Sequence, residues 1–274
     1  MQFLRRRQFL RATLATVSGW TLGCADAGEP AIDTGNAQDG HELFPQSVAS
    51  GDPRSESLIL WTRVEIPDVE DEDVELYLEL FADEELTQAA MWEEGPLQAL
   101  VATAKHDHCV KVRVVGLEPA TVYYYRFVAQ VGDDLFASRT GRTKTAPAKD
   151  ADTPVKFAFV SCQDFGGRWF NGYAQLVTKD PDFFVHLGDY IYETAGDSGF
   201  QGGTEGREVV FEDSGNVLVV DPNGDGGYQA ARSLANYRQL YRIHRSDPAL
   251  QRVHERLPMI ATWDDHEFAD DCWG

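Results

Sequence analysis

Three apolar segments in the second half of the chain each run directly into polar residues. "VKFAFV" runs into "SCQD", "DFFVHL" into "GDYIYE", and "PMIA" into "TWDDHE". A short stretch with helical spacing, "WFNGYAQLVTKD", separates the first two, which predicts a β-α-β unit with parallel strands. Ligands of such sheets bind outside the carboxyl ends of the strands. The sequence therefore predicts an α/β region whose functional site lies where these three strands end.

The residues at these strand ends are of types that bind metal ions. They offer a thiolate, a phenolate, an imidazole and several carboxylates, from Cys162, Asp189, Tyr192, Asp265, His266 and Glu267. Thiolate and phenolate suit a strongly Lewis-acidic ion such as Fe³⁺, whereas carboxylates suit a hard cation such as Ca²⁺. Two neighbouring ions can clamp a phosphoryl group and activate water. A mixed metal centre built from these donors is thus able to support phosphoryl chemistry.

Taken singly, the same residues have structural explanations. Cys162 could be a small buried apolar residue, and Asp189 could cap a helix. Tyr190 is expected to pack inside, because at two residues from Tyr192 it points elsewhere. His186 lies within a strand and is expected to be a buried core histidine. The other histidines without a metal-binding context are expected to be structural: His106, His108, His244 and His254.

The region before the α/β part alternates apolar and polar residues. "DVELYLELFA" and "TVYYYRFVA" have the period of two that is typical of half-buried strands. Closely spaced strands without intervening helices predict an immunoglobulin-like or fibronectin-type sandwich over residues 42–146. Residues 147–153, rich in Pro, Ala, Lys and Asp, are expected to be a linker, and the α/β region to span residues 154–274.

The N-terminus predicts export. Residues 1–24 combine consecutive arginines with an apolar stretch too short to span a bilayer, and Arg6-Arg7-Gln8-Phe9-Leu10-Arg11 is similar to a twin-arginine signal. Leu22-Gly23-Cys24 is similar to a lipobox, so Cys24 is a candidate lipid anchor, with an ordinary cleavage site as the alternative. A polar linker is expected over residues 25–41. The twin-arginine translocation machinery would be a partner of the chain. The exported protein would then be periplasmic, secreted or anchored by lipid to the bacterial envelope.

The formal net charge of −21 argues against nucleic-acid binding, because such a surface repels phosphate backbones. Three cysteines follow Cys24, an odd number, and none has the C-x-x-C spacing of a paired-cysteine zinc site.

"DPNGDG" at residues 221–226 imitates the opening of an EF-hand loop. Arg232 stands where such a loop needs a bidentate Glu, so a solvated turn is favoured over a calcium site.

Four blocks together resemble one family. "FPQSVASGDPRSESLILWTR", "VSCQDF", "HLGDYIYE" and "YRIHRSDPALQRVHERLPMIATWDDHE" occur in the order found in PhoD-type alkaline phosphatases and phosphodiesterases, within the calcineurin-like metallophosphoesterases. The resemblance covers residues 44–270. It implies that the α/β region is the N-terminal portion of a four-layer αββα metallophosphoesterase domain that hydrolyses phosphate monoesters and diesters.

The resemblance also implies residue roles. Cys162 and Tyr192 would bind Fe³⁺, Asp189 would bridge iron and calcium, and Asp265 would replace the metal-binding Asn of a related G-N-H-E motif. His266 would face the phosphate, stabilising charge or protonating the leaving oxygen. Asp270 stands where the family usually has Asn. Its side chain could still bind Ca²⁺, although it carries a negative charge where the Asn side chain is neutral.

The family continues for some hundreds of residues beyond the position of Gly274, with later histidines that complete its metal site. We therefore expect this chain to be an incomplete copy of a phosphatase, with an uncovered apolar face on its third parallel strand. The alternative is a noncatalytic envelope-binding module with a relic metal site. A module stabilised by calcium at "DPNGDG" is a third hypothesis.

Overall fold

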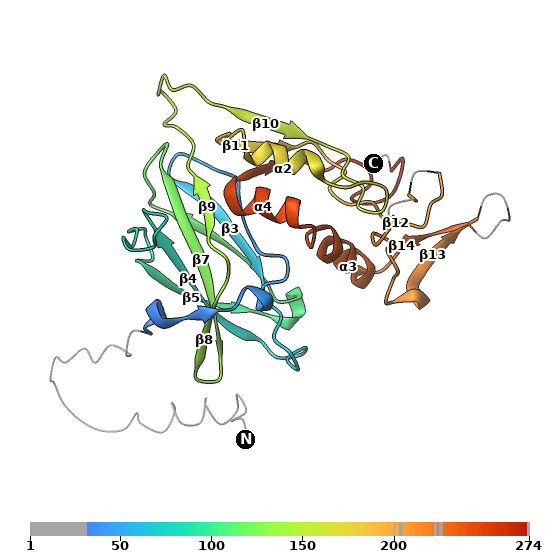
Figure 1. Ribbon diagram of the computed structural model, residues 1–274, viewed down its shortest axis with the longest axis horizontal. Coiled ribbons are helices and arrows are strands. Elements are labelled where there is room, and N and C mark those ends of the chain that lie inside the picture. Colours follow the sequence, from blue (N-terminus) through green and yellow to red (C-terminus); the bar gives the residue numbers. More distant parts are fainter. Residues whose placement is uncertain (1–31, 200, 203–204, 222–223, 225–226, 273–274) are drawn as a thin grey trace. The chain divides into compact units, whose positions relative to one another are not determined.

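The computed structural model describes residues 32–199, 201–202, 205–221, 224 and 227–272 (Figure 1). The chain divides into two compact units, Met1–Asp33 and Thr34–Gly274, and the helices and strands below belong to the second. The predicted signal peptide, the candidate anchor Cys24 and most of "DPNGDG" lie outside the described residues. Within the described segments, none of the helices has the length and apolar character needed to cross a bilayer.

The first sheet is formed by the strands that alternate in sequence. Its central strands β7 and β4 pair antiparallel, and their alternating side chains Leu76, Leu78 and Phe127 are fully buried, as predicted. Two short strands extend the edge of the sheet beyond β7. The strands are β1 (Gln38–Asp39), β8 (Asp134–Ala137), β7 (Val122–Val131), β4 (Val74–Phe81), β5 (Leu97–Ala102) and β9 (Gly141–Lys144), which also pairs with β7.

The linker expected over residues 25–41 is wrong at its C-terminal end. β1 pairs in parallel with β8, so residues 38–39 are part of the sheet. Thr34 also donates a hydrogen bond to Glu79 (2.6 Å), a carboxylate that is paired with Arg126. Polar residues in this segment thus join the sheet through hydrogen bonds, which is why an apolar pattern did not reveal them.

The second sheet joins the parallel strands to the sandwich region. Three parallel strands continue into an antiparallel trio without a break. In order, they are β10 (Phe157–Val160), β11 (Phe183–His186), β15 (Met259–Ala261), β2 (Val48–Gly51), β3 (Ser57–Arg63) and β6 (Cys109–Val115). The boundary expected at residues 147–153 therefore separates strands that share one sheet.

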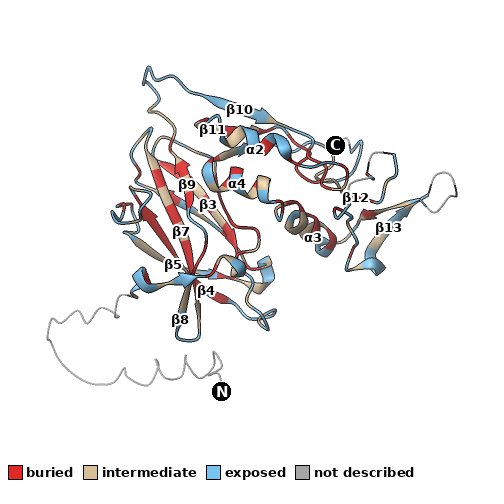
Figure 2. Ribbon diagram, in the orientation of Figure 1, coloured by how far each residue is buried: buried red, intermediate tan, exposed pale blue. Residues whose placement is uncertain are grey.

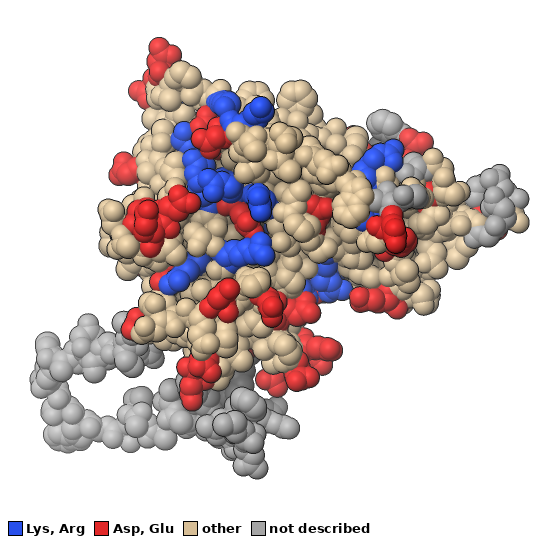
Figure 3. Space-filling model, viewed as in Figure 1, with Lys and Arg blue, Asp and Glu red and all other residues tan. Residues whose placement is uncertain are grey.

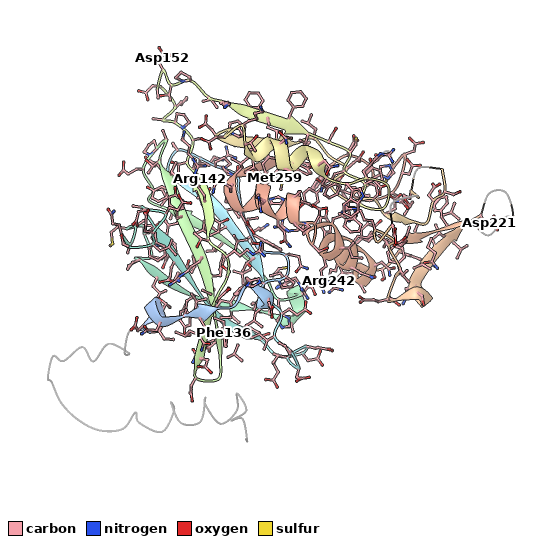
Figure 4. All side chains as sticks on the ribbon, viewed as in Figure 1. Phe136, Arg142, Asp152, Asp221, Arg242 and Met259 are labelled. Atoms are coloured by element: carbon pink, nitrogen blue, oxygen red, sulfur yellow. The ribbon has the colours of Figure 1, made fainter. Side chains whose placement is uncertain are left out.

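The junction between β15 and β2 is made by backbone atoms. Met259 is paired with Gly51, and its carbonyl accepts a hydrogen bond from the Asp52 amide (3.0 Å; Met259 is labelled in Figure 4). A Cβ at Gly51 would lie 2.9 Å from that carbonyl oxygen. Glycine is therefore required for this close approach of the two strands.

A buried apolar cluster lies between the two sheets. Leu58 and Leu60 of β3 meet Leu78 of β4 and Tyr125 of β7 in one cluster, and all four are at most 1% exposed. Buried positions recur along these strands in Figure 2. The two sheets are thus packed face to face, with alternate side chains of each turned inward.

Three helices cover the parallel strands. They are α2 (Asn171–Val177), α3 (Leu234–His244) and α4 (Pro248–Arg256). Ser233 begins α3 with a capping box, and Asp247 caps α4 by accepting from the amides of its first turn. Their inward faces are apolar, and Leu240, Leu250 and Val253 are fully buried. Arg242 of α3 donates to Asp107 (2.8 Å), in the turn before β6 (Figure 4).

Residues 193–231 form a Gly-rich segment that contains a small sheet not predicted from the sequence. Its antiparallel strands are β12 (Thr194–Ala195), β14 (Tyr228–Ala231) and β13 (Val217–Val220). Arg207 ties this segment to the helices: it is 3% exposed, donates to Asp247 (2.6 Å) and stacks 3.7 Å above the Phe165 ring. Four short 3₁₀ helices complete the described elements: Thr34–Asn36, His41–Leu43, Ala104–His106 and Ser214–Asn216.

One face of the parallel strands is exposed, as the sequence predicts for the third of them. Phe159 of β10 is 70% exposed and Ile260 of β15 is 40% exposed. The opposite face is buried, since Phe184 of β11 has no exposed surface.

We predict that buried histidines make the fold sensitive to acid. Burial lowers the pKa of His244 to about 4 and that of His254 well below its usual value. Between about pH 6.5 and 4 the unfolded chain therefore binds more protons, and each histidine lowers the free energy of unfolding by about 1.4 kcal/mol per pH unit as the pH falls.

The measurement is denaturant unfolding of the wild type and His254→Gln at pH 7, 6 and 5. The variant should lose part of the slope of stability against pH. His106→Gln, at an exposed position, serves as the control and should keep the wild-type slope. An unchanged slope in His254→Gln would contradict the prediction.

Candidate metal centre

The ends of the three parallel strands lie level with one another. Val160 of β10 is paired with His186 of β11, which is paired with Ala261 of β15. These are the last residues of their strands, and the first predicted ligand after each strand, Cys162, Asp189 or Asp265, follows within four residues. The register of the sheet therefore brings the three polar segments to one edge, as the sequence predicts.

Cys162 and Asp189 occupy matching positions at this edge. Both have left-handed backbones, with φ of 57° and 55°. The amides of residues 162 and 163 donate to the carbonyls of residues 188 and 189, which fixes the two loops together. The Cys162 thiol donates to Asp189 Oδ2 at 3.4 Å. Left-handed conformations of non-glycine residues cost free energy, and the hydrogen bonds between the two loops hold Cys162 and Asp189 in them.

Gly188 allows the loop after β11 to contact the turn after β15. Its φ is +109°, and a Cβ would lie 2.5 Å from both the amide nitrogen and the Cβ of Asp264. No side chain can be accommodated there without moving one of the two loops.

Glu267 holds these two segments together. Its Oε1 accepts the amide of Tyr190 (2.6 Å), and its Oε2 accepts the amides of Asp189 (3.1 Å) and Asp264 (2.8 Å). Glu267 was considered as an oxygen donor for a metal ion. Because both of its oxygens accept backbone amides, its role in this structure is to position the loops.

Asp189 has the properties of a carboxylate that lacks a cation. It is 7% exposed, and its Oδ1 makes no hydrogen bond among the described residues. Burial raises its pKa, and the negative charges of Asp264 and Glu267 add to this, against the hydrogen bond from Cys162 and the attraction of His266. A metal ion would satisfy the free oxygen and neutralise the excess charge.

Tyr192 lies beside the same pair, whereas Tyr190 does not. The Tyr192 ring lies against the His266 ring, with centroids 4.2 Å apart and the planes tilted by 34°. Burial raises the pKa of its phenol, and repulsion from Asp189 and Cys162 raises it further, so a phenolate needs a cation beside it. The Tyr190 hydroxyl instead lies 2.7 Å from His254 Nε2 in the core, and His186 is fully buried, both as expected.

The turn after β15 supplies the remaining predicted residues. Ligand atoms of Asp189, Asp265 and His266 lie within 4.8 Å of one another, and a second acidic group combines Asp265, Asp270 and Asp271. The Asp271 amide donates to Asp265 (2.6 Å) and lowers the pKa of that carboxyl. The Asp270 side chain is 68% exposed, with Oδ1 3.8 Å from His266 Nε2. Asp270 is therefore next to His266 and Asp265 but outside the group that contains Asp189.

Two buried acids near the centre were not singled out from the sequence. Glu193 lies 2.8 Å from His266 Nδ1 and is 4% exposed. Asp164 is buried, its Oδ1 accepts from Gln201 (3.0 Å), and its Oδ2 has no hydrogen-bond partner among the described residues. Burial raises the pKa of Asp164. Both acids are within the quoted motifs "SCQD" and "GDYIYE", but only tertiary contacts distinguish them from their neighbours.

A hollow of about 660 Å³ lies away from this centre. It is lined by Arg142, Arg252, Arg256, Glu84 and Glu255, among others. Arg142 is labelled in Figure 4, and Figure 3 shows Lys and Arg side chains gathered on this face among acidic groups. The hollow contains none of the predicted metal ligands, so we do not place the site there.

Comparison with known proteins identifies the family. "PhoD-like phosphatase, N-terminal domain" matches residues 27–147, and "PhoD-like phosphatase" matches residues 157–274. The chain is 33% identical over 273 residues to alkaline phosphatase D of Bacillus subtilis (strain 168), covering 96% of this chain and 42% of that protein.

A solved structure described as "Structure of PhoD" matches with a TM-score of 0.66 and 31% identity, over 84% of this chain and 40% of that one. The chain thus spans less than half the length of either relative. Two adjoining family regions and a matching fold agree, and the chain belongs to the PhoD-like phosphatase family.

Proposed function

We propose that this chain forms part of a secreted metallophosphoesterase that hydrolyses phosphate monoesters and diesters at an Fe³⁺/Ca²⁺ centre. The observation that carries the proposal is the convergence at one sheet edge of Cys162, Asp189 and Asp265, with a buried carboxylate oxygen that has no partner among the described residues. Membership of a phosphatase family supports the same reaction class.

The donor chemistry assigns the residues. Cys162 and Tyr192 would hold Fe³⁺, Asp189 would bridge, and Asp265 with Asp270 would hold Ca²⁺. When bound, the ions would supply Lewis acidity toward the phosphoryl group and an activated water. Asp189 fits this role because burial raises its pKa and the negative charges of Asp264 and Glu267 add to this, so a cation beside it would be stabilising.

His266 would act on the phosphate. Its pKa is raised: burial lowers it, but the hydrogen bond and charge of Glu193 and the charges of Asp189 and Asp265 more than offset this. A positively charged imidazole beside the centre would stabilise charge in the transition state or protonate the leaving oxygen.

We also propose a domain architecture for the chain. The two packed sheets would form an immunoglobulin- or fibronectin-like sandwich joined to one sheet of a four-layer αββα metallophosphoesterase domain. The parallel order of β10, β11 and β15, with helices over one face, supports the second assignment.

We predict that Asp189→Asn stabilises the metal-free protein and removes its stabilisation by metal. The amide avoids the penalty of a buried charge, and Asn tolerates the left-handed backbone of Asp189. Metal at 100 times its dissociation constant should stabilise the wild type by about 2.7 kcal/mol. Thermal unfolding with and without iron and calcium measures both effects.

Asp152→Asn, at an exposed position labelled in Figure 4, is the matched control and should respond to metal as the wild type does. Equal stabilisation of Asp189→Asn by metal would refute the site. A purified chain without iron would favour the noncatalytic binding module.

We predict that Tyr192 produces a visible charge-transfer band in the iron-loaded protein. Tyr192→Phe should abolish the band and lower hydrolysis of p-nitrophenyl phosphate and its bis ester by at least about tenfold. Tyr190→Phe should keep the band, because that hydroxyl contacts His254 in the core. Absorption spectra and iron content measure the outcome, and a band that persists in Tyr192→Phe would exclude it as the ligand.

Export through the twin-arginine route, with or without lipid at Cys24, is also proposed. Replacing Arg6 and Arg7 together by Lys should leave the uncleaved chain in the cytoplasm, measured by cell fractionation, whereas Arg11→Lys should be exported. Cys24→Ser should abolish labelling by a radioactive fatty acid if the anchor is present. Normal export of the double variant would count against this route.

A further inference from the structure

Glu193 is buried between His266 and the turn that follows it. Its side chain is 5% exposed, and Oε2 lies 2.8 Å from His266 Nδ1. Its other oxygen, Oε1, accepts the amide of Asp270 at 2.7 Å. One carboxylate therefore contacts both the imidazole ring and the backbone that carries Asp270.

The small sheet of the Gly-rich segment fixes Glu193 in this place. The residue immediately precedes β12, and its carbonyl accepts the Ala231 amide of β14 at 2.8 Å. On the chain's other side, Ile191 is fully buried. The backbone of Glu193 is thus held by a sheet and by a core side chain, so its carboxylate has a defined direction.

The contacts of the carboxylate determine where the imidazole carries its proton. An ionised carboxylate only accepts hydrogen bonds, so Nδ1 must be the donor to Oε2. Nε2 is then the nitrogen left to act outside this pair, and it lies 3.8 Å from Asp270 Oδ1. Tyr192 covers the ring face, which restricts rotation of the imidazole further.

We infer that Glu193 is a positioning residue that keeps the proton of His266 on Nδ1 and directs Nε2 to the substrate phosphate. This inference rests on the proposed phosphoesterase function. Because Nδ1 donates to Glu193, the second proton of the positively charged imidazole is on Nε2. Both roles proposed for His266, charge stabilisation and proton donation, use the proton on Nε2, so both require this orientation. A partner behind an active imidazole that sets its tautomer is a recurring device of catalytic and metal sites.

Glu193→Gln provides the test, because a Gln has one acceptor and one donor where Glu193 has two acceptors. If its oxygen continues to accept the Asp270 amide, its NH₂ group faces Nδ1 and favours the tautomer with the proton on Nε2. Glu193→Asp remains an acceptor at both oxygens and should keep the proton on Nδ1.

The tautomer is read from long-range ¹H–¹⁵N correlation spectra of the ¹⁵N-histidine-labelled full chain before metal is added, with the signal assigned by its loss in His266→Gln. We expect the wild type and Glu193→Asp to show the Nδ1–H form and Glu193→Gln to show the Nε2–H form. The same tautomer in all three proteins would overturn the inference.

Kinetics of the metal-loaded chain test the consequence. Glu193→Gln should lower kcat for p-nitrophenyl phosphate by about 10–100-fold, while KM changes little. The control is Glu79→Gln, at another buried glutamate, which pairs with Arg126 of β7; it should change stability without changing kcat or the His266 spectrum. An unchanged kcat in Glu193→Gln would also overturn the inference. If the wild type does not turn over, the proposed function fails, and the spectra still decide the role of Glu193.

Discussion

The carboxylate of Glu267 is the interaction on which the geometry of the site depends. It accepts three backbone amides from two segments that are far apart in sequence, those of Asp189, Tyr190 and Asp264. Hydrogen bonds to a charged acceptor are stronger than neutral ones, at about 1.5–3 kcal/mol each. Together they hold the loop after β11 against the turn after β15, the arrangement that also requires glycine at position 188.

The continuous second sheet gives this junction a rigid base. β15 has only three residues, but it lies between β11 and β2 and pairs with both. A strand this short would be a weak support at the edge of a sheet, and its central place removes that weakness. The sandwich region therefore supports the site directly, because β2 is also paired with β3.

The sequence predicted the parts of the site that follow from local rules. Apolar runs ending in polar residues located Cys162, Asp189 and Asp265 at one edge, because parallel strands align their carboxyl ends. The spacing of two residues was enough to predict different roles for Tyr192 and Tyr190. The small sheet was missed, since Val217–Val220 stands between turn-forming residues without a neighbouring strand pattern. The roles of Glu193 and Glu267 were not predicted. Glu193 contacts the His266 ring and Glu267 accepts backbone amides, and both contacts form only when segments that are distant in sequence meet in the fold.

The site differs from the rest of the core in how its buried carboxylates are satisfied. Buried charges elsewhere are paired, as Arg207 is with Asp247 and Glu79 with Arg126. At the strand ends, the carboxylate of Asp189 has an oxygen without a hydrogen-bond partner among the described residues, and the phenol of Tyr192 is opposed by negative neighbours. Each of these costs free energy in the metal-free chain. Because the costs coincide at one point and a bound cation would relieve the electrostatic ones, the fold is arranged there for binding rather than for its own stability.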